Sequence, residues 1–226
     1  MPLFDQEATQ YDAFFDTPLG RFVDQVEKQA LFEHFKINQN QTILEVGAGT
    51  GTLTRELAKQ GAKIDAYDIS KPMLEKAREN LENLANLVTF HTVDVHEVNV
   101  GTNQYDAAVS MATFEFLRDP KHVLTAMLDA VKPGGKVFIG TINKNGAWAE
   151  LYKSEAFKDT VFASATFLDE HSLKALAPGA CQSVHHTLFT PPDASTEALT
   201  LTQENKLKQQ NKEGGFLWAI FQKVQK

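Results

Sequence analysis

Three glycines alternate in the segment of this sequence whose residue types and spacing are best suited to chemistry. They are Gly47, Gly49 and Gly51, in the run EVGAGTG that begins at Glu45. Glycine lets the backbone turn sharply and lets a ligand approach the main chain closely. A helical pattern follows the run, and the first turn of a helix offers free N–H groups and partial positive charge. The spacing therefore predicts a ligand-binding loop between a strand and a helix.

Acidic residues stand at the ends of two apolar segments that come after this loop. Asp68 ends the segment 63–68 and Asp94 follows the segment 87–93. A carboxylate at the end of the second strand can accept hydrogen bonds from both hydroxyls of a ribose, which is also its role in nicotinamide-dependent enzymes. The nicotinamide fingerprint, however, places its third glycine at the sixth position of the loop, where this sequence has Thr52.

The rest of the sequence predicts a scaffold that would bring these strand ends together. Strand-like runs alternate with helical patterns, and Ser70 and Asp119 stand where helix N-caps are expected. An earlier amphipathic helix is predicted over 17–35, with Thr17 as its cap. The predicted strands are 42–46, 63–68, 87–93, 105–111 and 136–140. This alternation favours an α/β fold with a doubly wound parallel sheet, in which ligands bind beyond the carboxyl ends of the strands.

The C-terminal third of the sequence has a different pattern. Residues 182–189 and 216–223 are strand-like and predict an antiparallel hairpin at the sheet edge. The polar stretch 190–215 between them is long for a loop and is either mobile or contains a short helix. We expect one domain over 1–226. It would comprise a helical cap (1–36), a cofactor-binding core (42–141), and substrate-side helices with the C-terminal hairpin (142–226).

Five segments in register resemble motifs of the class I S-adenosylmethionine-dependent methyltransferases. Residues 43–54 (ILEVGAGTGTLT) are similar to the family's first motif and residues 67–78 (YDISKPMLEKAR) to its second. Asp94-Val95, Tyr105-Asp106 and Lys132 to Gly135 resemble the later motifs. The resemblance implies a Rossmann-like sheet of seven strands, mostly parallel with an antiparallel C-terminal strand. It also implies S-adenosylmethionine as cofactor and in-line transfer of its methyl group to a small-molecule acceptor.

The same resemblance implies which residues bind the cofactor. Glu45 would complement the ammonium group, Asp68 the ribose and Asp94 the adenine amine. The full predicted set is Glu45, Gly47, Ala48, Gly49, Gly51, Asp68, Ile69, Met73, Asp94, Val95 and Met111.

The acceptor is expected beyond the fourth strand. Glu115 is the best-placed candidate for a general base, although a purely structural acid fits the sequence equally well. The N-terminal segment resembles the cap of some small-molecule members, so its aromatic residues would close over the pocket. Ordinary helix packing is the alternative for each of them. The predicted acceptor-site residues are Tyr11, Phe15, Arg21, Phe114, Asn143, Trp148 and Tyr152.

Composition limits the remaining partners. The formal net charge of −7 disfavours non-specific binding to nucleic acid. The single cysteine, Cys181, cannot form an intrachain disulfide, and the histidines show no metal-ligand spacing. The chain lacks a signal-like start and an apolar run of about 20 residues, so we expect a cytoplasmic protein without a membrane span or a metal. Two other functions remain possible from the sequence: that of a nicotinamide-dependent oxidoreductase, and that of a non-catalytic S-adenosylmethionine-binding protein.

Overall fold

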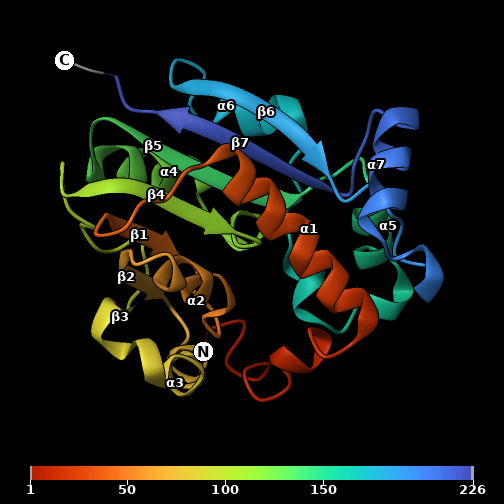
Figure 1. Cartoon of the computed structure of the whole chain (residues 1–226), viewed down its shortest axis with the longest axis horizontal. Helices are drawn as coiled ribbons and strands as arrows, with labels where there is room; N and C mark the ends of the chain where they lie inside the picture. The colour runs from red at the N-terminus through yellow and green to blue at the C-terminus, as the bar shows by residue number, and fades with distance from the viewer. Residues whose placement is uncertain (1, 225–226) are drawn as a thin grey trace.

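Seven strands form one sheet in the computed structural model of the chain, which describes residues 2–224 (Figure 1). Their order is β3-β2-β1-β4-β5-β7-β6, and β7 runs antiparallel to both of its neighbours, whereas β1 to β5 pair in parallel. This confirms the predicted sheet and its antiparallel C-terminal strand. The strands are β1 (Thr42–Val46), β2 (Lys63–Asp68), β3 (Val88–Thr92), β4 (Tyr105–Met111), β5 (Val131–Ile142), β6 (Cys181–Thr187) and β7 (Phe216–Gln222).

The strand order reverses between β1 and β4, and this position determines where a ligand can bind. The chain first adds β2 and β3 on one side of β1, and then returns to place β4 on the other side. The connections that leave β1 and β4 therefore diverge, which opens a crevice at the carboxyl ends of these two strands. The glycine loop follows β1 and the segment with Glu115 follows β4.

Side-chain caps define where several helices begin, as the sequence predicts. The Thr17 side chain accepts from Gly20 N at 2.9 Å, Ser70 from Met73 N at 3.3 Å, and Asp119 from His122 N at 2.9 Å. Each cap satisfies a backbone donor that the helix itself leaves unpaired. The longer helices are α1 (Pro18–His34), α2 (Thr52–Lys59), α3 (Lys71–Asn80), α4 (Pro120–Ala130), α5 (Ala147–Tyr152), α6 (Glu170–Ala175) and α7 (Leu201–Gln210).

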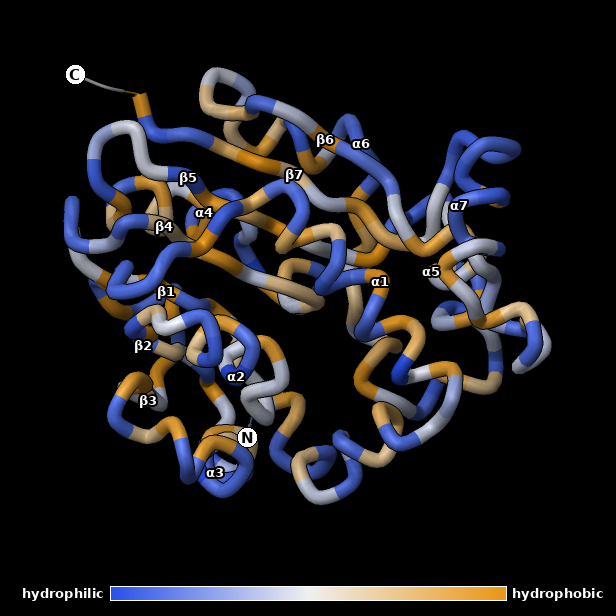
Figure 2. Tube along the Cα trace, viewed as in Figure 1, coloured by the Kyte–Doolittle hydropathy of each residue, from blue (hydrophilic) through white to orange (hydrophobic). Residues whose placement is uncertain are grey.

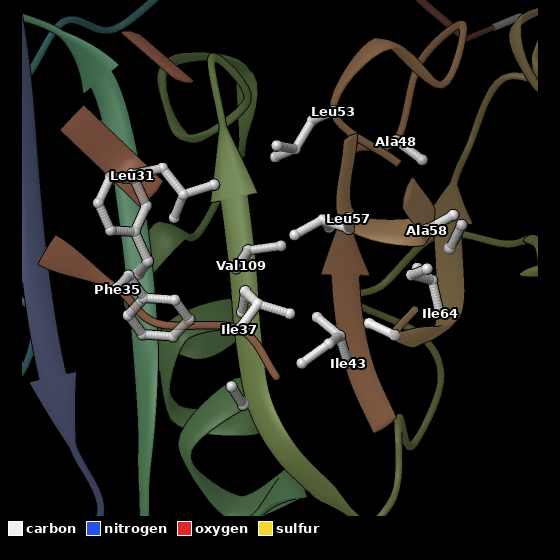
Figure 3. Close-up of a cluster of buried hydrophobic side chains, with 14 of the residues drawn as sticks. Leu31, Phe35, Ile37, Ile43, Ala48, Leu53, Leu57, Ala58, Ile64 and Val109 are labelled. Carbon is white, nitrogen blue, oxygen red and sulfur yellow. The ribbon is translucent and has the colours of Figure 1, made fainter. Parts of the chain in front are cut away.

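Helices cover both faces of the sheet because alternate residues of each strand are apolar on opposite faces. On one face, Ile43 and Val109 pack against α2, α3 and the end of α1 that carries Leu31 (Figure 3). On the other face, Leu44 packs against α4 and α6. Figure 2 shows mostly hydrophobic residues along the central strands, whereas the edge strand β6 and the helix α7 are largely hydrophilic.

A third cluster joins the start of α1 to the C-terminal part of the chain. Phe22, Val23 and Val26 of α1 are buried with Trp148 of α5 and Phe216 of β7. This packing fixes α1 across the carboxyl ends of the central strands, next to the N-terminal segment drawn in red in Figure 1.

One segment differs from the sequence-based expectation, and in another the structure decides between two alternatives that the sequence left open. β5 begins at Val131 instead of Lys136, because Val131 pairs with Tyr105 before an irregularity that contains Gly134, whose φ is +77°. The stretch 190–215 contains a helix, α7, which has no continuous apolar stripe to reveal it. Its Glu204 is buried and accepts from Phe189 N at 2.7 Å and from Thr190 N at 2.8 Å.

Candidate active site

A cavity of about 340 Å³ opens at the carboxyl ends of β1 and β4. Its wall comes from the glycine loop, the ends of β2 and β3, the segment after β4, the N-terminal residues and one side of α1. All the predicted cofactor residues except Gly51 line it, and among the predicted acceptor residues Tyr11 and Phe15 do. The fold thus gathers residues that are far apart in sequence around one space.

The glycine loop turns through left-handed backbone conformations. Gly47 has φ +78°, and the N–H groups of Gly47 and Ala48 both donate to Tyr67 O, at 2.8 and 3.1 Å. A Cβ at Gly47 would lie 2.1 Å from Thr113 Oγ1, so the loop packs against the segment after β4. Gly49 has φ +53° and lines the cavity, and a Cβ there would meet nothing within 4 Å.

Gly51 has a packing role and does not touch the cavity. Its φ is +80°, and a Cβ at this position would lie 2.4 Å from Leu81 Cδ1 and 3.1 Å from Ala77 Cβ. The third glycine therefore lets the start of α2 lie close to α3.

Alanine at the two glycines is expected to separate packing from binding. Gly51→Ala combines backbone strain with overlap on α3 and should lower the free energy of unfolding by about 2–4 kcal/mol. Gly49→Ala brings only the left-handed strain of about 1–2 kcal/mol, but places a methyl group in the cavity. Denaturant titration and ligand titration of both variants test this. A larger loss of cofactor affinity in the Gly51 variant, at equal folded fraction, would contradict it.

Glu45 is a buried acid without a full set of partners. It is 2% exposed, and its Oε2 atom has no hydrogen-bond partner among the described residues. Burial raises the pKa of Glu45 to about 8 and the charge of Asp68 adds to this, while the Thr54 side chain and the charge of Lys28 oppose it. A buried acid that lines a cavity is suited to a ligand that carries a cation or a hydrogen-bond donor.

Asp68 holds the glycine loop and also faces the cavity. Its Oδ2 atom accepts from Gly49 N at 2.8 Å and its Oδ1 atom from Ser70 N at 2.8 Å. Burial raises the pKa of Asp68, although these backbone bonds favour the charged form. Each carboxylate oxygen can accept a second hydrogen bond, so a ligand with two hydroxyls can still bind here.

Asp94 lies at the other end of the cavity with two residues that the sequence did not single out. Its Oδ1 atom contacts His96 Nδ1 at 2.7 Å, and Arg118 Nη2 lies 3.4 Å from Oδ2. Because His96 Nε2 accepts from Asp119 N at 3.3 Å, the ring proton is on Nδ1. Burial would raise the pKa of Asp94, but the bonds from His96 and the charge of Arg118 outweigh it and hold the pKa below its ordinary value.

Most of the predicted acceptor residues lie away from the cavity wall. Phe114 is buried in the core between the sheet and α4. Asn143 Nδ2 donates to Gly214 O at 2.7 Å, and Trp148 Nε1 donates to Thr190 O at 3.0 Å, so both fix the C-terminal connections. Arg21 is exposed and donates to Asp16 O. Tyr152 stacks on the ring of Phe162, with 3.9 Å between the ring centroids.

Glu115 is buried directly behind the cavity and is not on its wall. It is 1% exposed, and its Oε2 atom accepts from Thr141 Oγ1 at 2.9 Å, while Oε1 has no partner among the described residues. Burial raises the pKa of Glu115 to about 7. Its charge influences the cavity, but a direct contact with a ligand would require the lining residues to move.

Residues 43–135 match the family model of a methyltransferase domain. This part of the chain is a methyltransferase domain. The match covers the glycine loop, Asp68 and Asp94, which are the residues that line one half of the cavity.

Curated relatives resemble the methyltransferase core of this chain. The ubiquinone biosynthesis O-methyltransferase of Hydrogenovibrio crunogenus is 33% identical over 114 residues, which are 50% of this chain and 47% of the relative. The enzyme of the same name from Serratia proteamaculans is 37% identical over 112 residues, 48% of this chain and 46% of the relative. The matching part thus spans about half the length of these relatives.

Solved structures extend the fold comparison to the whole chain. A crystal structure from Thermotoga maritima, described as an S-adenosylmethionine-dependent methyltransferase and possible histamine N-methyltransferase, superposes with a TM-score of 0.74. It is 22% identical and covers 98% of both chains. The N-terminal helices and the C-terminal strands therefore belong to a fold that this methyltransferase shares.

Sequence reasoning missed the part of the methyltransferase cavity that α1 provides. Asp24, Glu27 and Lys28 all line it. Glu27 stands among Val23, Val26 and Ala30 at helical spacing, and this acid within an apolar stripe was a usable signal.

The N-terminal segment is also tied directly to the glycine loop. Thr50 Oγ1 donates to Asp12 Oδ1 at 2.6 Å, and Asn80 Nδ2 donates to Asp12 Oδ2 at 2.9 Å. Nothing in the local sequence around Asp12 predicts these two contacts, because both partners come from distant elements.

Within residues 2–224, no helix is both long and apolar enough to cross a membrane. Within the same range, no group of three His, Cys, Asp or Glu side chains is arranged to hold a metal ion.

Proposed function

We propose that this chain transfers a methyl group from S-adenosylmethionine to a small-molecule acceptor. The observation that carries the proposal is Glu45, a buried acid that lines the cavity beside the glycine loop and whose Oε2 atom has no hydrogen-bond partner among the described residues. An amino-acid ammonium group would complement the charge of this carboxylate. The curated relatives are named as O-methyltransferases, but the match covers only the half of the chain that would bind the cofactor.

The lining residues fit the parts of the cofactor in a consistent order. Glu45 would hold the ammonium group, and the backbone of Ala48 and Gly49 would border the amino-acid moiety. Asp68 would accept from the ribose hydroxyls. Asp94 would accept from the adenine amine, with Val95 beside it. Ile69, Met73 and Met111 would supply apolar contacts along the same wall.

When bound, S-adenosylmethionine supplies an electrophilic methyl group on a sulfonium, so the protein contributes mainly geometry. Tyr11 and Phe15 border the cavity near α1 and would exclude water from the acceptor. The Asp12 contacts hold the N-terminal segment against the glycine loop, so the wall that shapes the acceptor space is coupled to the cofactor loop. Holding acceptor and cofactor in line removes much of the entropic barrier to their reaction.

We also propose one domain divided as the sequence suggests: cap (1–36), cofactor-binding core (42–141) and the C-terminal part (142–226). A small molecule, and not nucleic acid, is the proposed partner, because the net charge is −7. A nicotinamide-dependent oxidoreductase is disfavoured by Thr52 at the sixth loop position.

Calorimetric titration of the purified protein tests the cofactor. We expect saturable binding of S-adenosylmethionine and S-adenosylhomocysteine and no binding of NAD. Transfer of a labelled methyl group to an acceptor then separates an enzyme from a non-catalytic binding protein. Binding of NAD alone would overturn the proposal.

A further inference from the structure

Glu27 is an acid on the cavity wall that no side chain of the described chain neutralises. Within residues 2–224 it forms neither an ion pair nor a side-chain hydrogen bond. The cationic group that acts on Glu27 is Lys28, whose Nζ atom forms an ion pair with Asp24 Oδ1 at 2.7 Å. Burial raises the pKa of Glu27 well above its ordinary value, and the charges of Asp24 and Glu115 raise it further, while Lys28 opposes them.

Aromatic rings line the same cavity. Phe4 packs edge-on against Phe116 with 4.9 Å between the ring centroids, and Tyr11 packs against Phe15 at 5.8 Å. The ring centroids of Phe4 and Tyr11 are 6.2 Å apart. Aromatic faces attract organic cations, and such rings beside an acid are suited to an ammonium group.

Glu27 belongs to a different part of the cavity from Glu45. The charge of Lys28 acts on both acids, but Asp24 and Glu115 act on Glu27, whereas Asp68 acts on Glu45. The pKa of Tyr11 is raised by burial and then by the charges of Glu27, Glu115 and Asp68, so Tyr11 lies near enough to both Glu27 and Asp68 to be affected by each. Glu45 and Asp68 suit the cofactor, which leaves Glu27 for the second reactant.

We infer that the methyl acceptor is an amine that is cationic in solution, bound by the Glu27 carboxylate beside the rings of Tyr11, Phe15 and Phe116. This inference rests on the proposed methyltransferase function and specifies its acceptor class.

Glu27 also accounts for the proton in such a transfer. The ammonium group gives one proton to the Glu27 carboxylate, which frees the nitrogen lone pair. The N–C bond then forms as the C–S bond breaks, with the bonding electron pair left on sulfur. The product is a methylated ammonium ion, and the proton passes from Glu27 to solvent. A carboxylate with a raised pKa is a better proton acceptor for an amine than an exposed one.

The test compares three probes of similar shape on protein saturated with S-adenosylhomocysteine. They are 2-phenylethylamine (cationic), 2-phenylethanol (neutral) and 3-phenylpropanoate (anionic). We expect the amine to bind at least about tenfold more tightly than the alcohol, and the anion to bind most weakly. Labelled methyl transfer from S-adenosylmethionine should go to the amine.

Two variants locate the effect. Glu27→Gln should reduce the preference for the amine over the alcohol to within about twofold, while binding of S-adenosylhomocysteine changes little. Glu33→Gln is the matched control, because Glu33 is exposed on the same helix, where it accepts from Gln29 Nε2 and lies 4.0 Å from His34 Nε2, and it does not line the cavity. The comparison of probes on the unmodified protein stands even if the Glu27 variant does not fold.

The outcomes separate the two proposals. If S-adenosylhomocysteine does not bind the unmodified protein, the proposed function fails. If it binds, but the amine binds no more tightly than the alcohol, the acceptor inference alone is overturned. It is also overturned if Glu27→Gln weakens S-adenosylhomocysteine as strongly as it weakens the amine, because Glu27 would then serve the cofactor.

Discussion

Glu45→Gln is expected to stabilise the ligand-free protein above neutral pH and to weaken its binding of S-adenosylmethionine. Burial raises the pKa of Glu45 to about 8 in the folded chain, against an ordinary value near 4.3 in the unfolded chain. The folded state therefore binds more protons than the unfolded state, and stability falls as the pH rises through this interval. By about pH 8 the penalty is roughly 3–5 kcal/mol.

Glutamine has the same size and no charge, so the variant lacks this penalty. Its free energy of unfolding should exceed that of the parent by only about 1 kcal/mol near pH 5 and by a few kcal/mol near pH 8.5. A residual slope is expected in both proteins, because burial also raises the pKa of Glu115 to about 7 and that of Glu27 well above its ordinary value. Urea titrations at the two pH values measure the difference, with Glu33→Gln as the control. Equal stability of parent and Glu45 variant at pH 8.5 would contradict the burial argument.

Binding should change in the opposite direction to stability. Loss of a charge-assisted bond to the ammonium group is expected to weaken S-adenosylmethionine by roughly 1.5–3 kcal/mol, which is more than tenfold. At pH 7 the parent should release protons on binding, because the cofactor cation favours ionised Glu45. Calorimetry in two buffers of different ionisation enthalpy detects that release, and the variant should show less of it.

The central sheet could be predicted because its signals are local. Apolar runs of strand length, the capping residues Thr17, Ser70 and Asp119, and the glycine loop each determine a short piece of backbone. The handedness of strand crossovers then leaves few ways to assemble them. The sequence did not decide whether 190–215 contains a helix. The residue that α7 buries is Glu204, and its partners are the backbone N–H groups of Phe189 and Thr190, which lie outside the helix.

The cofactor half of the candidate site follows strand ends and was predictable, whereas the acceptor half was not. Gly47, Asp68 and Asp94 lie on the wall because each follows or ends a parallel strand. We expected Trp148 and Asn143 to line the acceptor site. Their side chains instead donate to Thr190 O and Gly214 O, and so hold the C-terminal connections in place. The contribution of α1 depends on how that helix crosses the sheet, which no local pattern determines.

Asp68→Ala is expected to weaken S-adenosylhomocysteine by roughly 1.5–3 kcal/mol, or about tenfold to more than a hundredfold. The loss combines two effects, because Asp68 also accepts from Gly49 N and Ser70 N. Removing the carboxylate takes away the proposed ribose contact and loosens the glycine loop at the same time. Asp68→Asn keeps one acceptor oxygen, and should retain more of the loop structure than alanine does.

Ligands that differ only in the ribose separate the two effects. The parent should bind adenosine clearly more tightly than 2′,3′-dideoxyadenosine, because the second ligand lacks both hydroxyls. If Asp68 binds the ribose, Asp68→Ala should weaken adenosine much more than dideoxyadenosine, which is affected only through the loop, and so remove the preference. If Asp68 only holds the loop, both ligands should weaken together and the preference should survive. Survival of the parent's preference in a folded Asp68→Ala protein would therefore remove Asp68 from the ribose site and leave it as a residue that positions Gly49.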